Sequence, residues 1–160
     1  MADVGIATIC SAIADTFKAA SITDPVSGNV LRVQDYDELT EGLADMPTLQ
    51  VYPQGGTTDV ATANDRSAFR GRVRQTDTTF ILDLYARRRV HIGEDMEIVV
   101  KLVDLVIAVL QNQTTQPMFG LTVGNIKPIK SFEWNWARVL LDYSIEQYVG
   151  ARFELVVRTF

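Results

Sequence analysis

Cysteine and histidine are almost missing from this chain, which has one residue of each in 160. A single cysteine cannot form an internal disulfide, and Cys10 stands among Ile6, Ile9 and Ile13, where a small buried apolar residue is expected. The sequence therefore predicts a fold that needs no disulfide, made in a reducing compartment or within an assembly formed in one.

Long apolar runs are also missing. The longest one, residues 98–110, is interrupted by Lys101 and Asp104 and is too short to cross a bilayer. The first residues include no basic stretch ahead of the apolar ones, so we expect no secretory signal. These absences predict a soluble protein without a membrane partner.

Few residues are available for catalysis or for binding a cofactor. His91 follows the arginines at 87–89, which disfavour the imidazolium that a catalytic base must become. The acidic run at 35–41 lacks the spacing of a calcium loop, and Gly55-Gly56 is not followed by the Lys-Ser/Thr of a phosphate loop. We expect no enzyme, no metal site and no cofactor.

Charge is distributed unevenly along the chain, whose net charge is −5. Residues 1–60 carry nine acids and two bases, a net of −7, whereas residues 61–92 carry three acids and seven arginines, a net of +4. Residues 93–160 carry eight acids and six bases, a net of −2. Such segregation favours head-to-tail contacts between copies, although a fold can also bring the two signs together within one copy.

Two segments show helical periodicity. Apolar residues at 6, 9, 13 and 17 predict a helix over about 4–20, with Asp3 as its N-cap. Residues 94–111 predict a longer helix that opens with acids, contains the pair Glu97–Lys101 and is apolar around most of its circumference. The first helix covers that apolar excess within the monomer, or a neighbouring copy does, or both.

The remaining regular segments alternate as strands do. We expect strands at 48–52, at about 72–87, at 132–136, and in two runs at 141–148 and 152–160 separated by a break at Gly150. Between the first two, residues 54–66 are expected to form a flexible loop. Residues 21–46 are expected to be mostly irregular, with a turn of helix near 37–43. A strand over 72–87 would exceed roughly 50 Å, so part of it should project as a hairpin arm.

These elements predict one α+β domain over residues 1–160, with a mainly antiparallel sheet that carries the long helix on one face and the N-terminal helix beside it. The aromatic residues Tyr52, Trp134 and Trp136 are assigned to the core or to packing anchors. No internal repeat is present.

Arginines supply the candidate site residues. Three roles for these arginines remain open. They could form a solvated strand face that prevents edge-to-edge aggregation, dock onto an acidic protein surface, or contact DNA phosphates. For intersubunit or partner contacts we select five of them: Arg70, Arg72, Arg74, Arg87 and Arg88.

Taken in order, the chain resembles the tail terminator (tail completion) proteins of long-tailed bacteriophages. The resemblance rests on the apolar N-terminal helix, the segment DMPTLQVY at 45–52, the long strand at 79–87, the helix at 94–111 and the terminal run ARFELVVR at 151–158. It implies a homo-oligomeric, six-fold ring in the virion that caps the tail tube, joins the head connector and lets DNA pass through its channel. Such a subunit is made in the host cytoplasm.

Two other functions remain open. The first is a head–tail connector or neck-closure protein, which would have a similar fold. It would be distinguished from a terminator by the head or tail subunit that it binds. A small nucleic-acid-binding protein acting through the arginines would bind with a steep dependence on salt.

Overall fold

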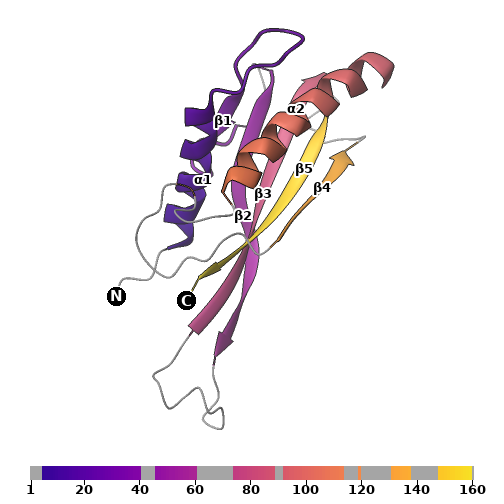
Figure 1. The fold of residues 1–160 in the computed structure, drawn as a ribbon. Helices are drawn as coiled ribbons and strands as arrows, with labels where there is room; N and C mark the ends of the chain where they lie inside the picture. Colours follow the sequence, from indigo (N-terminus) through magenta and orange to yellow (C-terminus); the bar gives the residue numbers. More distant parts are fainter. Residues whose placement is uncertain are drawn as a thin grey trace.

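In the part of the chain that the structure describes, five strands form one mixed sheet in the order β1-β2-β3-β5-β4, and two helices accompany it (Figure 1). This computed structural model describes residues 5–40, 46–60, 74–88, 92–113, 119, 131–137 and 148–159. In chain order the elements are α1 (Ile6–Ala20), β1 (Arg32–Gln34), β2 (Thr48–Val60), β3 (Arg74–Arg88), α2 (Ile92–Asn112), β4 (Ser131–Ala137) and β5 (Tyr148–Thr159). Only the pair β1–β2 is parallel, so the prediction of an α+β fold with a mainly antiparallel sheet is confirmed.

The N-terminal helix forms where the apolar spacing predicts it. Ile9, Ile13 and Phe17 of α1 are buried, since residues three and four apart share one face of a helix. The N-cap is Gly5, and the predicted cap Asp3 lies outside the described residues. Ser21 ends the helix in the left-handed conformation, with its N–H bonded to the carbonyl of Lys18.

The long helix is also confirmed, over Ile92–Asn112. Its acids Glu94 and Asp95 lie in the first turn, where the helix dipole favours them. Lys101 bonds Glu97 at 2.8 Å, as the i,i+4 spacing predicts. In Figure 1 the helix runs diagonally past the upper ends of β3 and β5.

The core lies between the helices and one face of the sheet. Alternate residues of β3 and β5 point into it, such as Phe80, Leu82, Phe153 and Leu155. α1 packs over β1 and β2, and α2 packs over β3 and β5. Each helix thus covers its own pair of strands.

β2 and β3 extend beyond the body of the domain as a two-stranded arm (Figure 1). Their pairing continues to Val60↔Arg74, past a register shift between Pro53 and Gly55. The hairpin arm is therefore present, but the flexible loop predicted over 54–66 is wrong for residues 54–60. β2 does not end at Pro53, because a bulge there allows its pairing with β3 to continue from Gly55 onward. Residues 61–66 lie outside the described part of the chain.

The described residues of 21–46 are mostly irregular, as predicted, although they include β1 and a bridge between Thr23 and Val30. Residues 36–38 form a turn, and part of the helical turn predicted near 37–43 lies outside the described residues. One further prediction is wrong. Gly150 does not interrupt β5, because it pairs with Tyr85 inside a continuous strand. Of the strand predicted at 141–148, residues 141–147 lie outside the described residues, and Tyr148 is the first residue of β5.

Candidate interaction surfaces

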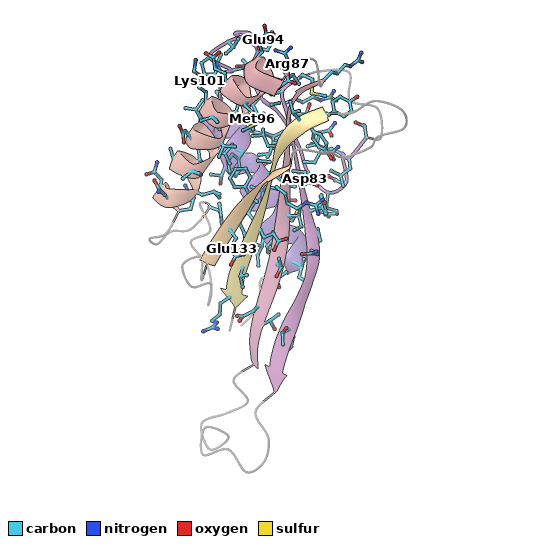
Figure 2. The ribbon with its side chains drawn as sticks, turned by 90° about the vertical axis from the view of Figure 1, so that its right-hand side faces the viewer. Asp83, Arg87, Glu94, Met96, Lys101 and Glu133 are labelled. Carbon is cyan, nitrogen blue, oxygen red and sulfur yellow. The ribbon has the colours of Figure 1, made fainter. Side chains whose placement is uncertain are left out.

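The five selected arginines do not form one described cluster. Arg70 and Arg72 lie outside the described residues, and Arg74 is the first residue of β3. Arg87 pairs within the monomer, with its Nε 3.0 Å from Oδ1 of the buried Asp95 of α2. Arg88 is exposed at the end of β3. Arg87 therefore ties β3 to α2, and Figure 2 shows it beside the start of that helix.

The sheet face opposite the helices holds a buried ion pair that we did not predict. Asp83 of β3 is 2 % exposed and accepts bonds from Arg152 of β5, at 2.8 Å from Nε and 3.1 Å from the terminal nitrogen. The hydroxyl of Tyr52 on β2 donates to the same carboxylate at 2.6 Å. This bidentate pairing holds the pKa of Arg152 well above its usual range. Three strands are thus linked through one carboxylate.

A second pair repeats the arrangement farther along the same two strands. Arg158 donates from Nε to Asp77 at 2.8 Å and from its terminal nitrogen at 3.1 Å. Asp77 and Asp83 lie on the same face because they are six residues apart on an uninterrupted stretch of β3. The arginines of β5 are therefore neutralised by the aspartates of β3.

Two glutamates of this face lack such partners. Glu133 of β4 and Glu154 of β5 are directly opposite each other in the register. Glu133 is exposed and Glu154 is half-buried. Figure 2 labels Glu133. Like charges directly across a strand pair repel each other. Among the described residues, neither carboxylate has a hydrogen bond or an ion pair.

The outer side of α2 carries apolar residues on both flanks of a polar stripe. The stripe contains Glu97, Lys101 and Asp104, all exposed. On its flanks, Met96 is 38 % exposed, Val100 39 % and Leu105 37 %. Met96 and Val100 are four residues apart and share one flank, which we call the α2 shoulder. The figure labels Met96 near the start of the helix (Figure 2).

The described residues bear on the predictions about metal sites, His91 and membrane spans. They contain no group of three or more potential metal ligands, and His91 lies outside them. Within the same ranges, no helix is both long and apolar enough to span a membrane.

Cys10 is fully buried in α1, and its Sγ is 3.7 Å from the carbonyl oxygen of Val51. Burial, helped by the nearby carboxylate of Asp35, raises the pKa of the thiol to about 12. Because the thiolate is the nucleophile, we expect a disulfide reagent at pH 8 to modify the native protein at least about a hundredfold more slowly than the urea-unfolded chain. The rate should rise with pH as the thiolate forms. Equal rates for folded and unfolded protein would contradict this burial.

The Asp83–Arg152 pair was missed because its members are far apart in sequence. The available signal was a single acid within the apolar run of β3 and an arginine at the start of an alternating run in β5. Only the register Asp83↔Arg152 brings them together.

No protein-family model matches the chain. The search of curated proteins also found no match.

Proposed function

We propose that this chain is a structural subunit that forms a homo-oligomeric ring, most simply a hexamer, at the head-proximal end of a phage tail. One face of the ring fits the last ring of the tail tube. The other face offers no surface to a further tube subunit and meets the head connector instead, while DNA passes through the central channel. Growth of the tube stops because the surfaces no longer match.

The observation that carries the proposal is the apolar surface of α2. Single exposed apolar residues are common on monomers, but here one helix exposes Met96, Val100 and Leu105 on two flanks. Within the described residues, α1 covers β1 and β2 rather than these flanks. A neighbouring copy would remove them from water, at roughly 25 cal/mol per Å² of apolar area buried.

The arm gives further support. β2 and β3 stay paired beyond the core as a ribbon (Figure 1), and Gly55, Gly56 and Thr57 within it are exposed. A two-stranded ribbon without a core is marginal in water. We infer that a neighbouring subunit or the tail tube packs against this ribbon and stabilises it.

The order of elements is consistent with the family resemblance. The chain has an N-terminal helix, a long β-hairpin, a long helix and a final antiparallel pair of strands. This is the order on which the resemblance to tail terminator proteins rests. A neck-closure or connector protein is the alternative in the same class. It would copurify with head subunits rather than with tube subunits.

Binding of nucleic acid is less well supported. Three of the described arginines, Arg87, Arg152 and Arg158, pair with aspartates of the same chain. An arginine that neutralises its own carboxylate releases little counterion on meeting a phosphate. The pairs therefore weaken the case for a basic DNA-binding face.

The test is to add the purified protein to growing tubes made of the tail-tube protein from the same genome. Wild type should stop elongation and appear as a ring at one tube end in electron micrographs. Val100→Asp should fold normally, because this side chain is 39 % exposed, yet weaken ring formation at least about tenfold by placing a charge in the interface.

Ala108→Asp is the matched control, since it introduces the same carboxylate on the exposed polar stripe of α2. It should cap tubes as wild type does. Tubes that grow past added wild-type protein would refute the proposed function. Rings formed equally well by Val100→Asp would remove the α2 shoulder from the interface.

A further inference from the structure

We draw no further inference here: the strongest candidate, the surface patch of the exposed apolar side chains Val26 and Val30 on the turn between Ile22 and Leu31, carries no proposal because nothing in the structure shows what covers it.

Discussion

Replacing Arg152 by methionine should lower the free energy of unfolding by about 3 kcal/mol. The reason is that the carboxylate of Asp83, 2 % exposed, would lose the guanidinium group that pairs with it. The value lies at the lower end of the range for broken buried pairs, since the guanidinium side of the pair is 39 % exposed. The melting temperature should fall by roughly 10 °C. Thermal and urea unfolding measure both quantities.

Arg158→Met is the matched control for this experiment. Its partner Asp77 is 20 % exposed and can be hydrated after the loss, so the expected cost is about 1 kcal/mol. Adding Asp83→Asn to Arg152→Met should recover part of the lost stability by removing the orphaned charge. Equal costs for the two arginine variants would show that Asp83 is not the buried carboxylate described.

Gly150→Ala should destabilise the fold by about 3 kcal/mol or more. Gly150 is buried between β3 and β4, and a Cβ atom there would overlap the carbonyl oxygen of Leu84. A backbone carbonyl within a sheet cannot rotate away without breaking the ladder, so β5 would have to shift. Poor expression or a strongly lowered melting temperature is the expected result.

Gly55→Ala is the control, because nothing lies within 4 Å of a Cβ atom added there. It should change stability by no more than about 0.5 kcal/mol. In contrast, a Cβ atom at Gly56 would be 2.6 Å from the carbonyl oxygen of Asp77, so Gly56→Ala should loosen the arm. If Gly150→Ala behaved like Gly55→Ala, the close approach of β5 to β3 would be refuted.

The helices and the central strands could be predicted from sequence because their apolar residues recur with the period of the element. Ile9, Ile13 and Phe17 follow the helical repeat, and Phe80, Leu82 and Leu84 follow the strand repeat. β1 could not be predicted in this way. Three residues are too few to show a period, and its pairing with β2 depends on contacts distant in sequence.

The arm shows a different limit of local reasoning. Gly55 and Gly56 are poor strand formers, and Pro53 lacks an N–H, so the sequence favours a loop. Pairing with the regular strand β3 overrides these preferences up to Val60. The same argument explains Gly150. The sequence suggests that a strand ends there, but a glycine is required at this position because β3 approaches it closely.

The interaction surfaces could be predicted only in part. Clusters of like charge are visible in sequence, and so were the arginines of residues 61–74. The like-charge pair Glu133 and Glu154 is not visible in sequence, because its members are 21 residues apart and meet only through the β4–β5 register. Arg87 was selected from the sequence for contacts with another molecule, but in the fold it pairs with Asp95 of the same chain.

Sedimentation of the purified full chain from nanomolar to high micromolar concentration, with electron microscopy of the same samples, tests the ring directly. We expect the mass to climb from one subunit to a closed multiple, and rings with a central hole to appear at the upper concentrations. A single-subunit mass at every concentration, with the α2 shoulder left in water, would contradict the account.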